Sequence, residues 1–94
     1  MKGVQRAKLR KLANGIEPIV HIGKEELTEN VLKQADDALT ARELIKCTLL
    51  KTCETSPREV ADEMSEKLGA ESIQVVGRKI VLYRQSTDDP KIVV

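Results

Sequence analysis

The segment that decides how this chain folds is IVHIGKEELT, residues 19–28. It begins as a short apolar run typical of a strand, breaks at Gly23, and ends on Thr28, a favourable cap for a following helix. A strand, a glycine turn and a helix in this order leave backbone N–H groups unpaired where the helix dipole favours negative charge. We therefore predict an anion-binding site at this turn, with Lys24 adding a mobile positive charge.

Apolar side chains recur at helical spacing in three stretches. These stretches are residues 3–13, 28–42 and 56–68. Gly15 follows the first stretch and is predicted to end that helix in a left-handed conformation. Ser56 as a cap and Pro57 at the first helical position predict the start of the third helix, and Gly69 predicts its end.

Four further stretches read as strands. They are residues 19–22, 44–50, 72–76 and 79–84. In the second strand Ile45 and Cys47 alternate with Lys46 and Thr48, which predicts one covered face and one wet face. The pair Gly77-Arg78 suits a two-residue hairpin with glycine first, so the last two strands should be antiparallel neighbours.

The element order is helix, strand, helix, strand, helix, strand, strand. It predicts an α/β chain of the α+β two-layer kind, with a four-stranded mixed sheet packed with helices. The 94 residues suffice for one small core, so we assign residues 1–84 to a single domain. The polar segment 85–94 is expected to form a flexible C-terminal tail.

Positive charge is concentrated at the start of the chain. Formal net charge is only +1, yet residues 1–11 hold five basic side chains and no acid. A chain with separated signs can carry a basic face at near-zero net charge. The charge of this helix alone leaves open a simpler explanation, in which its lysines only keep a solvated surface helix soluble.

Compartment and cofactor predictions follow from what the sequence lacks. No apolar run approaches membrane-spanning length and no signal-peptide core is present, so we expect a cytoplasmic protein with no membrane partner. Cys47 in its strand should be buried, whereas Cys53 in a loop should be exposed and reactive. The two thiols could pair or share a metal, but no His or Cys cluster accompanies them, so no metal and no cofactor are predicted.

No constellation of catalytic residues is evident. The lone histidine, His21, lacks an acid–base partner nearby in sequence, and no phosphate-binding motif with the Walker lysine occurs. We therefore predict neither an enzyme nor a small-molecule substrate. Tyr83 is the only aromatic residue, so a nucleic acid would be held through its phosphates and shape rather than by base stacking.

Six segments in order resemble one family. They are QRAKLRKLA (5–13), EPIV (17–20), IGK (22–24), LTE (27–29), RELIK (42–46) and QVVGRKIVLYR (74–84). Over residues 3–84 the chain resembles a stand-alone CRM domain of the YhbY-like RNA-binding family. The resemblance implies a fold similar to the C-terminal domain of bacterial translation initiation factor three. It also implies RNA binding and, for single-domain bacterial members, association with precursors of the large ribosomal subunit.

The resemblance also implies a role for the glycine turn. The family's RNA-contacting loop is a G-x-x-G turn, compared with the backbone clamp of KH domains. Here that loop corresponds to residues 23–26, where Gly23 matches and Glu26 replaces the second glycine. A carboxylate repels phosphate, and a residue with a Cβ resists a left-handed conformation.

These observations predict a non-catalytic, monomeric RNA-binding protein acting in ribosome assembly, with large-subunit ribosomal RNA or pre-ribosomal particles as its partner. The predicted RNA-binding residues are Lys2, Arg6, Arg10, Lys11, Gly23, Lys24, Arg78, Lys79 and Arg84. The alternative is a protein–protein adaptor that uses the exposed sheet face. A steep salt dependence of RNA binding would distinguish the first from the second.

Overall fold

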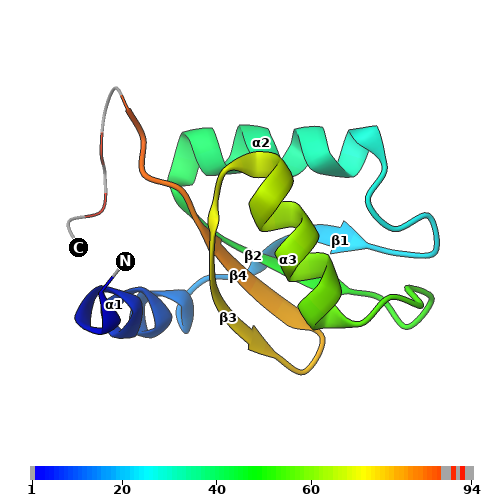
Figure 1. The fold of residues 1–94 in the computed structure, drawn as a ribbon, viewed down its shortest axis with the longest axis horizontal. Coiled ribbons are helices and arrows are strands. Elements are labelled where there is room, and N and C mark those ends of the chain that lie inside the picture. The colour runs from blue at the N-terminus through cyan, green and yellow to red at the C-terminus, as the bar shows by residue number, and fades with distance from the viewer. Residues whose placement is uncertain (1, 88–89, 91, 93–94) are drawn as a thin grey trace.

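The computed structural model describes residues 2–87, 90 and 92 of the chain. It contains three helices and four strands in the predicted order (Figure 1). Their bounds are α1 Gly3–Ala13, β1 Pro18–Ile22, α2 Glu29–Arg42, β2 Leu44–Leu49, α3 Pro57–Leu68, β3 Glu71–Val76 and β4 Lys79–Tyr83. Each bound lies within one residue of its prediction, and the α+β fold class is confirmed.

Most of the predicted start and stop signals act as expected. The side chains of Thr28 and Ser56 cap α2 and α3, each accepting the backbone N–H three residues further on, at 3.1 and 3.3 Å. Gly69 ends α3 with φ of 62°, and Gly77 opens the β3–β4 hairpin with φ of 58°. Both angles lie in the left-handed region that glycine adopts without steric cost.

The end of α1 differs from the prediction. Asn14 keeps right-handed helical angles, and Gly15 is not among the residues with positive φ. The N–H groups of residues 14–16 instead bond to carbonyls three residues earlier, at 3.2–3.3 Å. These bonds tighten the last turn and satisfy the free carbonyls, so a left-handed residue is not needed.

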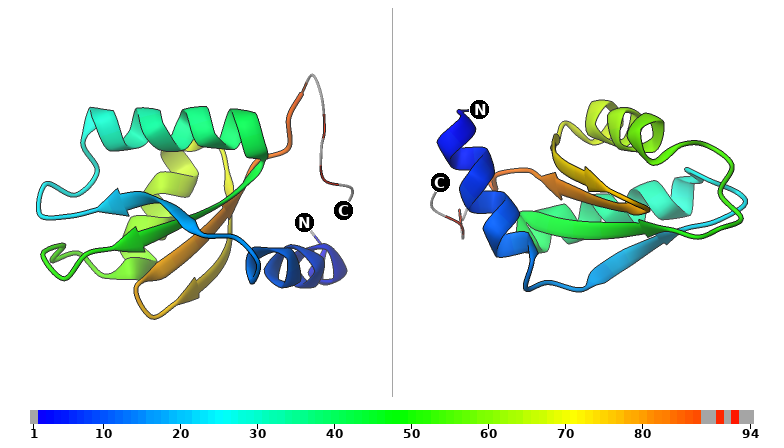
Figure 2. Two further views of the ribbon diagram at one scale, coloured as in Figure 1. Left: turned by 180° about the vertical axis from the view of Figure 1, so that it is seen from behind. Right: turned by 90° about the horizontal axis from the view of Figure 1, so that it is seen from below.

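The sheet has the strand order β1-β2-β4-β3, in which β1 and β2 are parallel and the other neighbours antiparallel. The hairpin strand β4 lies between β2 and β3, so the crossover through α3 does not produce a parallel pair of neighbours. Figure 2 shows α2 and α3 on one side of the sheet and α1 at one end of the molecule. We name the side under α2 and α3 the closed face, and the side that α1 contacts the half-open face.

The main core fills the closed face. Ala35 and Leu39 of α2 and Met64 of α3 are fully buried against the apolar side chains of the strands. Cys47 is buried there as predicted. Cys53, predicted to be exposed, is also buried, because the loop after β2 folds back over the end of this core.

A second cluster fills one end of the half-open face. Leu9 and Ala13 of α1 pack against Leu44, Val81 and Tyr83. The prediction that this face of β2 is wet is therefore only partly met, because Leu44 is buried and both Lys46 and Thr48 are half-buried. The sequence pattern could not show that α1, remote along the chain, returns to cover part of this surface.

Glu43 anchors part of the C-terminal segment. Its side chain is fully buried, and its carboxylate accepts the backbone N–H groups of Ser86 at 2.6 Å and Ile92 at 2.8 Å. Ile92 also packs against the second core cluster. These contacts place Ser86 and Ile92 against the fold, while the flexibility of residues 85–94 stays a prediction. Residues 88–89, 91 and 93–94 of the predicted tail lie outside the described part of the chain.

Candidate nucleic-acid interface

Arg6, predicted to hold RNA, is used to dock α1 on the sheet. Its guanidinium donates to the carbonyl of Ser72 at 2.7 Å and to the carboxylate of Glu71 at 3.1 Å. In the folded chain Glu71 therefore offsets part of the positive charge of α1, which has no acid nearby in sequence. The side chain of Arg6 is 34% exposed, so a phosphate would have to compete with this bonded arrangement.

The other predicted cations of α1 point to water. Lys2, Arg10 and Lys11 are exposed, and none of them takes part in an ion pair within residues 2–87. Arg10 and Lys11 occupy the last turn of the helix, where positive charge also complements the helix dipole. These three side chains are available to an anionic ligand.

The glycine turn between β1 and α2 is compact. The N–H of Glu26 donates to the carbonyl of Gly23 at 2.9 Å, and that of Thr28 to the carbonyl of Glu26 at 3.1 Å. Since the Thr28 hydroxyl also accepts the N–H of Val31, part of the donor set predicted to be free is already used. Lys24 is exposed at the tip of the turn.

Glu26 has the left-handed conformation that a glycine would adopt there, with φ of 58°. Its carboxylate also accepts a hydrogen bond from the Thr55 hydroxyl in the loop before α3. The turn thus has a left-handed residue at its fourth position despite the missing glycine. The bond to Thr55 joins the two loops at this end of the sheet.

Arg78 and Lys79 of the hairpin behave differently. The Arg78 guanidinium donates to the carbonyls of Leu49 at 3.0 Å, Leu50 at 2.7 Å and Cys53 at 3.3 Å. It holds the hairpin against the loop after β2. The neighbouring Lys79 is exposed and makes no ion pair within the part of the chain that the structure describes.

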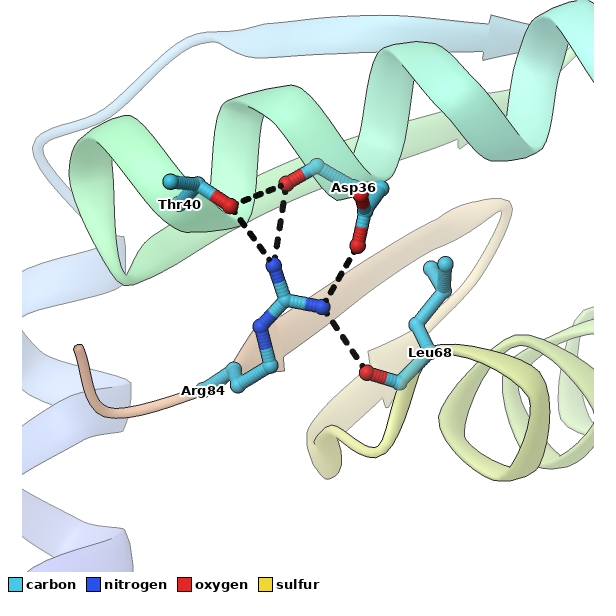
Figure 3. A network of polar contacts seen from close by, with 4 residues as sticks. All are labelled: Asp36, Thr40, Leu68 and Arg84. Carbon is cyan, nitrogen blue, oxygen red and sulfur yellow. Dashed lines mark hydrogen bonds and ion pairs between the residues drawn. The ribbon is translucent and has the colours of Figure 1, made fainter. Parts of the chain in front are cut away.

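Arg84 is the centre of a polar network that joins β4 to two helices (Figure 3). Its guanidinium donates to the Asp36 carboxylate at 2.8 Å, to the Asp36 carbonyl at 3.0 Å, to the Thr40 hydroxyl at 2.9 Å and to the Leu68 carbonyl at 2.9 Å. Its side chain is 24% exposed. Arg84, which was predicted to bind RNA, therefore joins the C-terminal parts of α2 and α3 to the sheet.

Lys46 was not among the RNA-binding residues predicted from the sequence, although it lies on the half-open face. Lys46 of β2 borders a hollow of about 220 Å³ on the half-open face, together with Asn14, Gln74 and Lys79. The signal was present, since Lys46 alternates with the buried Ile45 and Cys47. The alternation alone does not show which residues lie beside Lys46. The pairing of β2 with β4 brings it onto the same face as Lys79.

The described residues contain no group of three His, Cys, Asp or Glu side chains placed to hold a metal ion. Burial raises the pKa of the Cys47 thiol to about 12, which suppresses its thiolate form and hence its reactivity.

Across the described ranges, no helix has the length and apolar character to cross a bilayer.

The chain forms a small α+β domain whose sheet has one closed and one half-open face. Its predicted RNA-binding cations are either bonded within the fold or exposed. The model of the CRS1 / YhbY (CRM) domain family matches residues 1–84, and the chain belongs to that family. This finding confirms the family resemblance found in the sequence.

Individual relatives agree with this assignment. A Bacillus subtilis protein named probable RNA-binding protein YqeI is 36% identical over 92 residues, which cover 98% of this chain and 96% of that protein. A Haemophilus influenzae protein named RNA-binding protein is 31% identical over 84 residues, covering 89% and 85% of the two chains. The solution structure of a hypothetical protein from Staphylococcus aureus is similar, with a TM-score of 0.84, 41% identity, and coverage of 100% and 98%.

Proposed function

We propose that this protein binds RNA without catalysing a reaction on it, and that its target lies on precursors of the large ribosomal subunit during their assembly. RNA binding is supported by the names of the relatives and by the exposed cations. The ribosomal target is supported by the resemblance of nearly the whole chain to the single-domain members of the family.

The observation that carries the proposal is the division among the predicted RNA-binding cations. Three arginines, Arg6, Arg78 and Arg84, are bonded to carbonyls or carboxylates of the fold. The remaining five are exposed, namely Lys2, Arg10, Lys11, Lys24 and Lys79. Exposed cations without an acidic partner keep their charge available for phosphates, whose neutralisation releases counterions and drives binding.

Gly23 adds a second, independent argument. Its φ is not positive, and a Cβ built there would lie 3.4 Å from Leu50 and 3.5 Å from Thr52, which are ordinary contacts. The fold itself would therefore accept alanine at this position. A glycine that the fold does not require suits close approach of a ligand backbone, such as a phosphate chain.

A salt titration tests RNA binding. With about five phosphate contacts on single-stranded RNA, the logarithm of affinity for large-subunit ribosomal RNA fragments should fall with the logarithm of salt concentration with a slope near −3 to −4. A flat response would contradict the proposal and favour the protein–protein adaptor.

A separate experiment tests the ribosomal target. Sedimentation of a lysate from growing cells should place the protein with precursors of the large subunit, and raising the salt concentration should release it. Co-sedimentation with small-subunit particles, or with none, would contradict this part of the proposal while leaving RNA binding intact.

A further inference from the structure

Beyond the third row, which α1 covers, the half-open face has two further cross-strand rows, and the second of them is buried only at Val81, which packs in the cluster beneath α1. The row nearest the glycine turn is His21, Thr48, Lys79 and Val76, in the order β1, β2, β4 and β3. The next row is Pro18, Lys46, Val81 and Gln74. In the third row Leu44 and Tyr83 are buried beneath α1. We name the first two rows the open rows.

The open rows carry positive charge and no acid. Their charged residues are Lys46 and Lys79, and neither is among the ion pairs found in residues 2–87. The acid nearest in sequence is Glu17, next to Pro18, which lines a second hollow together with two cations, Arg42 and Lys46. Two lysines in rows that contain no acid are complementary to a polyanion and unfavourable for another basic surface.

The open rows also connect the two parts of the predicted RNA surface. His21 in the first row is two residues before Gly23, so this row borders the glycine turn. At the other end the hollow beside Lys46 reaches Asn14, the residue that caps the C-terminus of α1. Figure 2 shows α1 and the turn between β1 and α2 at opposite ends of the sheet. Lys79 lies two residues along β4 from Val81, which is buried in the cluster beneath α1, and four residues from Tyr83, a distance of about 13 Å.

We propose that one strand of unpaired RNA crosses the open rows from α1 to the glycine turn, with Lys46 and Lys79 holding successive parts of its backbone. The inference rests on the proposed function and specifies its path. The side-chain amides of Asn14 and Gln74 line the same hollow and offer both donors and acceptors. Such groups can read the Watson–Crick edge of a base, and in a duplex that edge is occupied by the partner base.

The test compares two double variants with equal charge changes. Lys46→Gln with Lys79→Gln removes the lysines of the open rows. Lys33→Gln with Lys67→Gln is the matched control, because these two lysines lie on the outer surfaces of α2 and α3 and are 76% and 52% exposed. The probes are a labelled RNA strand of roughly 12 nucleotides and the duplex that it forms with its complement, with affinities measured at several salt concentrations.

The wild type should prefer the single strand to the duplex. The variant of the open rows should bind the strand about tenfold more weakly, with a salt slope smaller by about 1.4 for two lost phosphate contacts. The control variant should stay within about twofold of the wild type. Since Lys46 is half-buried, Lys79→Gln alone supplies a second measurement, with an expected loss of about threefold and an unchanged melting temperature.

Three results would overturn the path. They are equal losses in the two double variants, unchanged binding by Lys79→Gln, and a duplex bound as tightly as the strand. In all three the wild type still binds RNA, so the proposed function stands. If instead the wild type binds neither probe nor ribosomal RNA fragments in a salt-dependent way, both the path and the proposed function fail.

Discussion

The two faces of the sheet are built from the same four strands and differ in what covers them. On the closed face two helices seal a continuous apolar core, whereas on the half-open face α1 covers one end only. The cations divide by role and not by face. Arg6, Arg78 and Arg84 use their planar forks of donors to join elements, while the cations left exposed are mostly lysines. The closed face holds the larger core and so contributes most of the stability, while the proposed RNA path lies on the half-open face.

The largest effect should come from a cavity in the closed face. Leu82 is fully buried there, so Leu82→Ala should lower the free energy of unfolding by about 2–5 kcal/mol. Val76→Ala is the counterpart on the half-open face, where Val76 is 60% exposed, and should change stability by about 0.5 kcal/mol or less. Urea denaturation measures both. Similar losses in the two variants would show that the faces are not divided in this way.

A second prediction concerns alkaline pH. Because burial raises the pKa of Cys47 from 9.0 to about 12, the unfolded chain loses this proton first as pH rises. Stability from the buried neutral thiol is therefore complete below pH 9 and is lost as pH rises toward 12. The loss should reach roughly 3 kcal/mol near pH 11. Burial, and then the charge of Glu43, raises the pKa of Tyr83 and acts in the same direction.

Cys47→Ala is the control for this measurement. It should lower stability at neutral pH by creating a small cavity, yet flatten the decline in the free energy of unfolding at alkaline pH. Thiol labelling adds an independent check, since both Cys47 and Cys53 are buried and should react slowly in the native protein. An equally steep alkaline decline in Cys47→Ala would assign the effect to other groups.

The third prediction separates structural from binding cations. Arg84→Gln removes a guanidinium with four bonds and should lower the free energy of unfolding by about 1–2 kcal/mol while leaving RNA affinity unchanged. Arg10→Gln with Lys11→Gln should have the opposite profile, with stability within about 0.5 kcal/mol and RNA affinity roughly tenfold lower. If Arg84→Gln weakens RNA binding at temperatures where it is folded, Arg84 also belongs to the binding surface.

The elements themselves were predictable because their signals are local. Ser56 with Pro57, the hairpin glycine Gly77 and the alternation around Cys47 each act within a few residues. The first two are confirmed, and the alternation is confirmed for its covered face but only partly for its wet face. Gly15 was predicted wrongly because a helix end has more than one way to satisfy its carbonyls, and the local pattern does not choose between them.

The candidate site was harder to predict because it depends on distant pairings. Arg6 looked free until β3 brought Glu71 beside it, 65 residues away in sequence. Arg84 looked free until α2 brought Asp36 beside it, 48 residues away. Lys46 was overlooked for the opposite reason, since only the register of β2 and β4 places it near Lys79. Charge counts along the sequence cannot distinguish a bonded cation from an available one.

The smallest expected effect lies at the glycine turn, where both proposals meet. Glu26→Gly should remove the cost of a left-handed residue with a Cβ, about 1–2 kcal/mol, but also the bond to Thr55, which is of similar value. The melting temperature should therefore change little. RNA affinity should rise about twofold at low salt, because two unit charges roughly 10 Å apart in water repel by about 0.4 kcal/mol.

Glu26→Gln distinguishes the two causes of such a gain. It keeps the side chain, the left-handed strain and an oxygen for the Thr55 hydroxyl, and removes only the charge. If charge limits affinity, both variants should gain about twofold at 0.01 M salt, where the Debye length is about 30 Å, and the gain should vanish near 1 M, where the Debye length is only about 3 Å. If only the glycine variant gains, and gains equally at both salt concentrations, the conformation of the turn limits binding. Unchanged affinity in both variants would place the RNA more than a Debye length from Glu26, and the strand would then have to leave the sheet before reaching the turn.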